Sequence, residues 1–421
     1  MQKALRQLPQ GLPHFRVLLN PGLGPGPYLV PRRSVSGPNH AMRFLPLLLA
    51  VSLLTVAARA QAPAPASSSK PNNQRSASAK PSFIPFPIVF SQPETGFGYG
   101  LAVLPVYRFG SDTTTRSSNA RLLAYRTTRQ QSAVQLTHNI FTSGEKYLVS
   151  GELSYYHNFP ISYFGTGPAT QLNDKSIIQY RVLIFEERGL RQVVPNLFAG
   201  LRYRLTSLSD VQANTASDDG APSRLFARPL IEYQGRTVTS GLGPTLLFDN
   251  RDNILSSFRG NYLELSGLFN GSALGSDNAF SRYQLDARHF RPLFQSTNTI
   301  LAVQLLAQLH TGTVPFRELA NLGGASQLRG YFEGRYRDRQ LLAAQAEIRH
   351  HLFWRLNGAV FGGVGQVGPG LNRLGEGGLK VAGGAGLRFQ FNRRDRLNAR
   401  LDYGVGRGGS SGVYFSIGEA F

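Results

Sequence analysis

The sequence predicts an all-β fold, a sixteen-stranded antiparallel transmembrane β-barrel over residues 83–421. First, apolar and polar residues alternate with a period of two through this region, as in strands whose two faces meet different surroundings. Second, the alternating segments run about 10–13 residues, close to the ~9–11 that a tilted strand needs to cross a bilayer, whereas soluble strands usually have about 5–6. Third, a secretory leader precedes these segments.

The first 82 residues predict a targeting sequence and a linker rather than a folded domain. Residues 1–41 are rich in Pro, Gly and Arg without periodicity, and we expect them to be a mis-annotated extension, with translation starting at Met42. Residues 42–60 form a signal peptide, because a single Arg precedes a short apolar run and a small-x-small cleavage site at residues 58–60. Residues 61–82 are rich in Pro, Ala and Ser and are expected to be a disordered linker.

The strands are expected to follow one another from residue 83 to the end of the chain. Residues 398–405, for example, set Leu401, Tyr403 and Val405 against Arg400 and Asp402, and residues 381–392 set Leu387 and Phe389 against Arg388. A soluble sandwich would bury the apolar face, whereas a barrel points it at lipid, and the strand length favours the barrel. The expected strands are 83–90, 97–109, 119–129, 131–141, 147–157, 177–187, 196–207, 236–248, 260–271, 281–293, 297–310, 340–353, 356–367, 380–392, 396–407 and 411–421.

The connections and the chain end follow from the same pattern. The long connections 158–176, 208–235 and 311–339 are expected to be external loops. In the last strand, the side chains of Val413, Phe415, Ile417 and Phe421 share the parity that faces lipid. This strand is expected to pair with the first one and close the barrel, because a bilayer offers no water to an open edge.

Charge and composition exclude several other classes of protein. The net charge is +21, but residues 1–82 carry ten Lys or Arg and no Asp or Glu, and the remaining basic residues are scattered. Nucleic-acid binding is therefore not expected. The chain has no cysteine, which excludes a disulfide scaffold and a thiolate metal site.

No catalytic, metal or cofactor site is predicted. The histidines are scattered, and His350 and His351 are neighbours in a strand, so they point to opposite faces. The carboxylates Asp249 and Asp252 lack the spacing of a calcium loop. The glycine-rich stretch 362–370 has no helix after it, which rules out a phosphate-binding loop. We therefore do not expect an enzyme.

Four stretches resemble the BamA/TamA family of outer-membrane barrels, the bacterial surface antigen superfamily. Together they cover roughly residues 240–421, and they read GPTLLFDNRDN (243–253) with Gly260-Asn261-Tyr262 after it, LRGYFEGR (328–335), AEIRHHLF (346–353) and FSIGEAF (415–421). The resemblance implies two groups of family residues, a turn motif and a carboxy-terminal targeting signal: Asp249, Arg251 and Asp252, and Phe415, Ile417, Gly418 and Phe421.

The resemblance also implies that the loop around Arg329 folds into the lumen, where its guanidinium meets carboxylates of the barrel wall. Glu347 matches one of these acids. Gly330 lets the backbone approach closely or adopt a positive φ, and Tyr331 packs beside it. Such an Arg–carboxylate pair is charge-assisted and fixes the position of the loop more than it adds stability.

The chain departs from the family pattern in two places. Gly363 stands where the family carries its second acid, so either the loop is held more weakly or another carboxylate, such as Asp402, substitutes. Family members that assemble barrels also carry periplasmic POTRA domains before the barrel, and residues 61–82 do not fit such a domain. The chain therefore resembles a stand-alone barrel of the superfamily.

The resemblance implies a location in the bacterial outer membrane, with membrane lipid and lipopolysaccharide as partners. The arginines at 335, 337 and 339 are expected to form a basic external surface that meets lipopolysaccharide phosphates. The barrel assembly machinery would be a partner for the chain's own insertion. Three functions stay open: outer-membrane biogenesis or translocation of protein or lipid through a lateral seam, a passive pore, and a structural surface-antigen barrel without transport. The sequence fixes neither the cargo nor the oligomeric state.

Overall fold

A computed structural model of the chain describes residues 82–92, 96–109, 115–213, 235–294, 296–393 and 395–421. The predicted extension at 1–41, the signal peptide at 42–60 and all but the last residue of the linker at 61–82 lie outside the described residues.

The described chain forms one antiparallel sheet of 16 strands in which each strand pairs with its neighbours along the chain. The strands that the sequence predicts are present, with ends that differ by a few residues at most positions. Their bounds are β1 Ser82–Gln92, β2 Gly96–Tyr107, β3 Ser118–Thr127, β4 Ser132–Phe141, β5 Tyr147–Tyr163, β6 Ser176–Val194, β7 Leu197–Ala213, β8 Thr237–Asp249, β9 Gly260–Asn270, β10 Phe280–Leu293, β11 Ser296–Gly312, β14 Gln340–Phe353, β15 Leu356–Gly368, β16 Lys380–Asn392, β17 Leu397–Gly406 and β18 Ser411–Ile417.

Two further strands lie in the segment between β11 and β14. They are β12 Ala320–Leu322 and β13 Tyr336–Asp338, which pair with each other in a separate two-stranded sheet. The helical turns are short 3₁₀ segments: η1 Ser143–Glu145, η2 Leu172–Asp174, η4 Ser272–Leu274 and η5 Leu371–Arg373. Among the described residues, no helix is long and apolar enough to cross a membrane.

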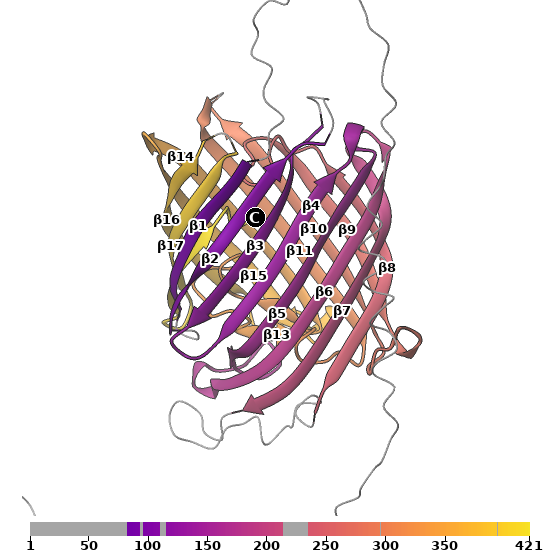
Figure 1. Cartoon of the computed structure of the whole chain (residues 1–421). Coiled ribbons are helices and arrows are strands. Elements are labelled where there is room, and N and C mark those ends of the chain that lie inside the picture. The colour runs from indigo at the N-terminus through magenta and orange to yellow at the C-terminus, as the bar shows by residue number, and fades with distance from the viewer. Residues whose placement is uncertain (1–81, 93–95, 110–114, 214–234, 295, 394) are drawn as a thin grey trace, which may run out of the picture. The chain divides into compact units, whose positions relative to one another are not determined.

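The large sheet curves round on itself with strongly tilted strands (Figure 1). Its two edge strands, β1 and β18, come to lie side by side. No backbone ladder joins them within the described strands, whereas every other pair of neighbouring strands in this sheet shares a ladder, some with a bulge or a gap. We call this contact between β1 and β18, which lacks a backbone ladder, the seam.

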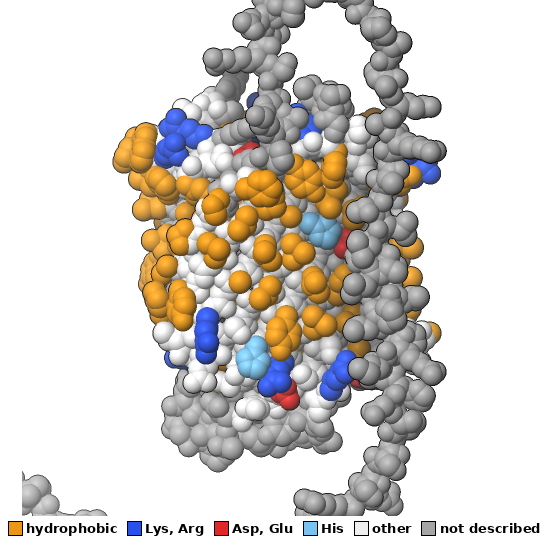
Figure 2. Space-filling view, in the orientation of Figure 1, with side chains coloured by type: hydrophobic (Ala, Val, Ile, Leu, Met, Phe, Trp, Pro, Cys, Tyr) orange, Lys and Arg blue, Asp and Glu red, His pale blue; other side chains and the backbone are white. Residues whose placement is uncertain are grey.

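The convex face of the sheet is apolar. Figure 2 shows hydrophobic side chains in a broad belt across the strands, with Lys and Arg near the two rims. Leu122, Val134, Leu136, Leu153 and Tyr155 belong to this belt and are exposed, as the predicted alternation requires. An apolar surface of this breadth on a soluble protein would be an association or aggregation site, and it is typical of contact with a membrane.

The opposite face, which we call the polar face, carries buried charges instead of a continuous apolar core. Arg202, Glu264, Asp286, Glu347 and Arg388 are each less than 9% exposed. Such side chains are almost never fully buried unless they are paired. The sheet is therefore apolar outside and charged inside, the reverse of a soluble domain.

The alternation breaks down on the polar face of β1 and β2. Phe86 on β1 and Ala102, Leu104 and Val106 on β2 lie on that face, and the three β2 side chains are buried. The expectation of a polar lining on every strand is therefore wrong for this part of the wall. Both faces are apolar here, so periodicity could not tell one from the other.

The end of the chain also differs from the prediction. β18 stops at Ile417, and Gly418 takes a φ of 89°, which turns the last residues off the strand. Phe421 is buried against Phe290 and Ala302, and its carbonyl accepts a hydrogen bond from Arg349 at 3.3 Å. Its expected lipid-facing position is therefore wrong, because the glycine turn places it inside the sheet.

Some strands are longer than predicted, because the strand continues past a point where the alternation of apolar and polar residues is interrupted. β5 runs to Tyr163, past the expected end at residue 157. Asn158 adopts a φ of 49°, and the pairing with β6 shifts between Tyr156 and Phe159. A bulge of this kind reverses the parity of the residues that follow it, so the alternation reads as if the strand had ended.

Candidate functional site

The segment 313–339 between β11 and β14 lies against the polar face and contacts the strands nearest the seam. At its tip, Gly330 has a φ of 123°, and a Cβ there would come 2.6 Å from the carbonyl carbon of Val405 on β17. Only glycine fits this approach. The Gly330 N–H donates to the Tyr414 hydroxyl at 2.9 Å, and the Ser410 hydroxyl donates to the Gly330 carbonyl at 2.7 Å.

Arg329 is the central side chain of this contact, and it is 1% exposed. Its Nη2 lies 2.6 Å from Glu347 Oε2 on β14, and its Nη1 lies 2.5 Å from Asp402 Oδ2 on β17. The guanidinium also stacks 3.5 Å from the ring centroid of Phe361 on β15. Charge-assisted hydrogen bonds to two carboxylates and a cation–π contact fix the direction of this side chain.

Three further arginines surround the same two carboxylates. Arg388 on β16 pairs with Asp402, with Glu347 at 2.9 Å and with Glu419 at 3.1 Å. Arg400 reaches Asp402 at 3.2 Å, and Arg349 reaches Glu347 at 2.9 Å. We call this set the arginine cluster: Arg329, Glu347, Arg349, Arg388, Arg400, Asp402 and Glu419.

The strand register explains why the cluster needs its carboxylates. Arg388 on β16 stands directly opposite Arg400 on β17, and two like charges at such a position destabilise a sheet. Asp402 accepts hydrogen bonds from both of these cations, and Glu347 accepts one from Arg388. Removing one partner of such a buried network leaves an uncompensated charge, which costs about 3–5 kcal/mol.

Tyr331 packs next to Arg329 and ties the segment to three strands. Its hydroxyl donates to the Val381 carbonyl at 3.0 Å, and its own carbonyl accepts a hydrogen bond from the Tyr414 hydroxyl at 2.7 Å. A Cβ on Gly406 would lie 2.6 Å from the Tyr331 ring, so that glycine makes room for it. The structure thus brings Arg329, Gly330, Tyr331 and Glu347 into one contact.

The position of the missing family acid is filled by packing. A Cβ on Gly363 would come 3.1 Å from Leu328 Cδ1 and 2.9 Å from the Cβ of Gln345. Leu328, the residue before Arg329, therefore occupies the space beside this glycine. The second carboxylate that meets Arg329 comes from Asp402 instead. Sequence reasoning placed Arg388, Arg400 and Asp402 on the polar faces of their strands, but it did not indicate that Arg388 and Arg400 meet Arg329.

The neighbouring arginines of the segment are mostly buried. Arg335 donates to the Thr170 hydroxyl at 2.7 Å and stacks 4.4 Å from the Phe164 ring, and Arg337 donates to the Gly334 carbonyl at 3.2 Å. Burial lowers the pKa of both guanidinium groups from the usual value. The expectation of an external basic surface is therefore wrong for these two residues, whereas Arg339 is exposed.

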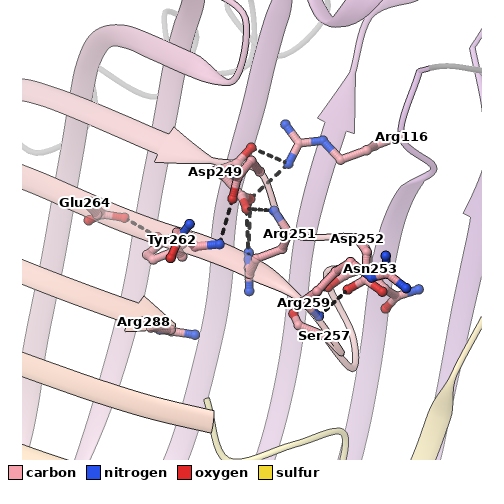
Figure 3. A network of polar contacts seen from close by, with 12 residues as sticks. Arg116, Asp249, Arg251, Asp252, Asn253, Ser257, Arg259, Tyr262, Glu264 and Arg288 are labelled. Atoms are coloured by element: carbon pink, nitrogen blue, oxygen red, sulfur yellow. Dashed lines mark hydrogen bonds and ion pairs between the residues drawn. The ribbon is translucent and has the colours of Figure 1, made fainter. Parts of the chain in front are cut away.

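A second network forms at the turn between β8 and β9 (Figure 3). Arg251 holds the Asp249 carboxylate at 2.9 and 3.1 Å, and Arg116, from the connection before β3, reaches the same carboxylate at 3.1 Å. Arg251 also lies 4.6 Å from the centroid of the Tyr262 ring. The first two residues of the predicted turn motif, Asp249 and Arg251, therefore contact each other directly.

The third residue of the motif, Asp252, connects this turn to a distant one. Its carboxylate accepts the Phe258 and Arg259 N–H groups at 2.9 and 3.2 Å and pairs with Arg396 at 2.6 Å. Arg396 precedes β17 and stacks 3.9 Å from the Phe258 ring. Leu255 packs against the apolar cluster of β2 and β17. Residues 250–259 therefore join two turns that are far apart in the sequence.

Most of the chain matches one protein-family model. The model of the Omp85 superfamily domain matches residues 90–421. The chain belongs to the Omp85 superfamily. BamA-like barrels of this superfamily are bacterial outer-membrane proteins, which agrees with the expected outer-membrane location.

Solved structures support the Omp85 fold. The chain is similar to BamA from Haemophilus ducreyi lacking POTRA domains 1–3, with a TM-score of 0.50, 15% identity, and coverage of 80% of this chain and 70% of that one. It is also similar to CdiB from Acinetobacter baumannii, with a TM-score of 0.52, 11% identity, and coverage of 80% and 59%. At these identities the likeness shows the fold alone. A search of curated proteins found no match.

Within the described part of this Omp85 chain, the polar networks have the composition of structural contacts. No group of His, Asp and Glu side chains there is placed to hold a metal ion. Arginine is the main cation of the networks, and a guanidinium stays charged and binds carboxylates in a fixed geometry. Contacts of this kind hold elements in place.

Proposed function

We propose that this chain closes into an outer-membrane β-barrel, with residues 313–339 folded into its lumen, and that it inserts or translocates polypeptide or lipid through the seam. The observation that supports this proposal is the contact of β1 with β18 without a backbone ladder. In a bilayer, unpaired N–H and C=O groups on a strand edge lack water as a partner. Because no ladder of backbone hydrogen bonds has to be broken between β1 and β18, the seam is the part of the wall that separates at the lowest free-energy cost.

The arginine cluster supports the same proposal, because it couples the lumen segment to the seam. Arg329 contacts β17 and Gly330 contacts β18, which is one of the two strands of the seam. Movement of the segment would change the position of β18, and opening of the seam would strain these contacts. The cluster in this view sets the closed state, and it is not a catalytic site.

Membrane partners follow from the apolar belt and remain part of the proposal. The belt meets outer-membrane lipid, and Arg339 is the one arginine at 335, 337 or 339 exposed enough to meet lipopolysaccharide phosphate. As a membrane barrel, the chain would need the barrel assembly machinery for its own insertion.

Depletion of the protein followed by comparison of the outer-membrane proteome tests this function. We expect lower levels of other barrel proteins or altered lipid distribution, with little conductance from the purified protein in planar bilayers. Large ungated conductance with a normal proteome would replace the proposal with a passive pore. A normal proteome and lipid distribution without conductance would favour a structural surface barrel.

A further inference from the structure

A cavity of about 290 Å³ lies on the polar-face side of the seam. Apolar side chains make up just over half of its lining, and both edges of the sheet contribute to it. Phe86 and Ile88 of β1 and Phe415 and Ile417 of β18 line it, together with side chains of β2 to β5. Phe415 keeps the outward parity that the sequence predicts, because it pairs with the exposed Leu401, and it lines the cavity from the edge of β18. Ile417 also packs against the buried side chains of Leu104 and Leu397.

The position of the cavity connects it to the membrane. Outside the wall, Val89 of β1, Leu101 of β2 and Leu122 of β3 are exposed members of the apolar belt. Inside the wall, Leu123 of β3 lines the cavity. The contact of β1 with β18, which has no ladder in the described sheet, borders the cavity on one side. Hydrocarbon outside and the cavity inside are thus separated by side chains at the seam.

The cavity contains one cation whose hydrogen-bonding capacity is incompletely used. Arg121 of β3 lines it, and the Arg121 Nε–H is buried without an acceptor among the described residues. Gln135 and Tyr156 also line it, but they hydrogen-bond to each other. Glu333 is the carboxylate of the lining, and it belongs to the 313–339 segment. An anionic group at Arg121 would satisfy the guanidinium.

We propose that this cavity binds the acyl chain of an anionic membrane lipid, which enters through the seam and pairs its phosphate with Arg121. A volume near 300 Å³ is at the small end of ligand sites and suits one slender chain. An acyl chain needs no hydrogen-bond partners, whereas each residue of a polypeptide strand brings an N–H and a C=O that do. The inference rests on the proposed membrane barrel.

Photoactivatable lipids test the site directly. The full chain is reconstituted with phosphatidylglycerol or lipid A that carries a diazirine near the end of an acyl chain, and adducts are mapped by mass spectrometry. We expect adducts on cavity residues such as Tyr125 and Tyr156 in addition to the outer belt. Of the two lipids, the one that labels the cavity residues is identified as the ligand. Adducts on the outer belt alone would overturn the inference and leave the barrel intact.

Matched variants on one strand separate cavity binding from nonspecific labelling. Leu123→Trp fills the cavity and should reduce cavity adducts to background, whereas Leu122→Trp, on the outer belt, should leave them unchanged. Ile88→Trp provides a second blocking variant if Leu123→Trp does not fold. If both blocking variants keep wild-type cavity labelling, the site is wrong.

The charge of Arg121 has its own test. Arg121→Gln should lower cavity labelling by the anionic lipid several-fold, and Arg126→Gln, which changes an exposed arginine on the same strand, should not. Equal labelling by the two variants would contradict the head-group contact. Absence of adducts on both faces would instead refute the membrane barrel itself, so the two failures are distinguishable.

Discussion

At the scale of single residues, Arg329 decides where the 313–339 segment lies. It is the one side chain of that segment that contacts Glu347 and Asp402 together, so it links β14 to β17 through two ion pairs. The energy of such a buried pair is largely offset by the cost of removing both charges from water. Its main effect is therefore on the position of the segment, with stability affected when one partner is removed.

Replacing Arg329 by Ala is expected to lower the free energy of unfolding by about 3–5 kcal/mol, because Glu347 and Asp402 lose a buried cation. Heat-modifiability and urea unfolding in detergent measure this. The control is Arg339→Ala, which removes an exposed arginine from the same segment. Equal unfolding of the two variants would show that the cluster does not hold the segment.

Glu318 gives the segment a dependence on pH. Burial raises the pKa of its carboxyl, but Arg204, Arg282 and Arg317 together outweigh burial and hold the pKa below the usual value near 4.5. A lowered pKa in the folded state means that Glu318 contributes stability above the unfolded pKa. That contribution is lost as the pH falls through the lower, folded pKa.

The melting temperature of the wild-type protein is therefore expected to fall as the pH drops below about 4.5. Glu318→Gln should be less stable at pH 7 and should show a shallower fall in that acid range, because it has no proton to bind at this position. Thermal unfolding followed from pH 7 to pH 3 compares the two proteins. A variant curve parallel to the wild-type curve would contradict this assignment.

Among single residues, sequence reasoning identified those that lie within a recognisable motif. Arg329 and Glu347 stood in family motifs, and the structure brings them into contact. Arg388 and Arg400 were placed only on the polar faces of their strands. Their meeting with Arg329 depends on how β16 and β17 lie against the segment, and alternation within one strand carries no information about that.

At the scale of elements, the turn 250–259 joins strands that are distant in the sheet. It is anchored at Asp249 by Arg251 and Arg116, and at Asp252 by Arg396. Leu255 adds an apolar contact to the cluster that includes Leu397. This turn therefore relates β8 and β9 to the β16–β17 connection, and it limits how far these elements move apart.

Arg396→Ala is expected to loosen this turn, because it removes the ion pair to Asp252 and the stacking on Phe258. The pair is partly exposed, so we expect less than about 1 kcal/mol of global stability to be lost. Amide hydrogen exchange over 250–259 should rise. Arg393→Ala, in the same connection but bonded to the Trp354 carbonyl, serves as the control. Unchanged exchange in the Arg396 variant would show that Asp252 alone holds the turn.

Most elements could be predicted from the sequence because alternation with period two survives wherever one face is apolar and the other charged. The exceptions have physical causes. β12 and β13 are three residues each, too short for a pattern. The bulge at Asn158 reverses the alternation within β5. The turn at Gly418 moves Phe421 to the inside, although Phe421 keeps the expected parity along the chain.

At the scale of the whole molecule, the chain is an Omp85 sheet that is apolar outside and charged inside, with one contact between edges that has no ladder. The family and the fold are shown by the sequence and structure matches. The proposed function depends on that contact. The arginine cluster lies next to it on β17. The cavity borders it on the polar-face side.

Crosslinking the seam tests this account most directly, and the absence of native cysteine makes it specific. The variant Ile88→Cys/Phe415→Cys places one cysteine on each edge of the seam, and a short bifunctional maleimide joins them. The control Leu101→Cys/Ala124→Cys joins β2 to β3, which already pair at these positions. We predict that crosslinking the seam reproduces the effect of depleting the protein on the outer-membrane proteome or lipid, and that the control crosslink has no effect. Wild-type levels of both with a fully crosslinked seam would contradict transport through β1 and β18.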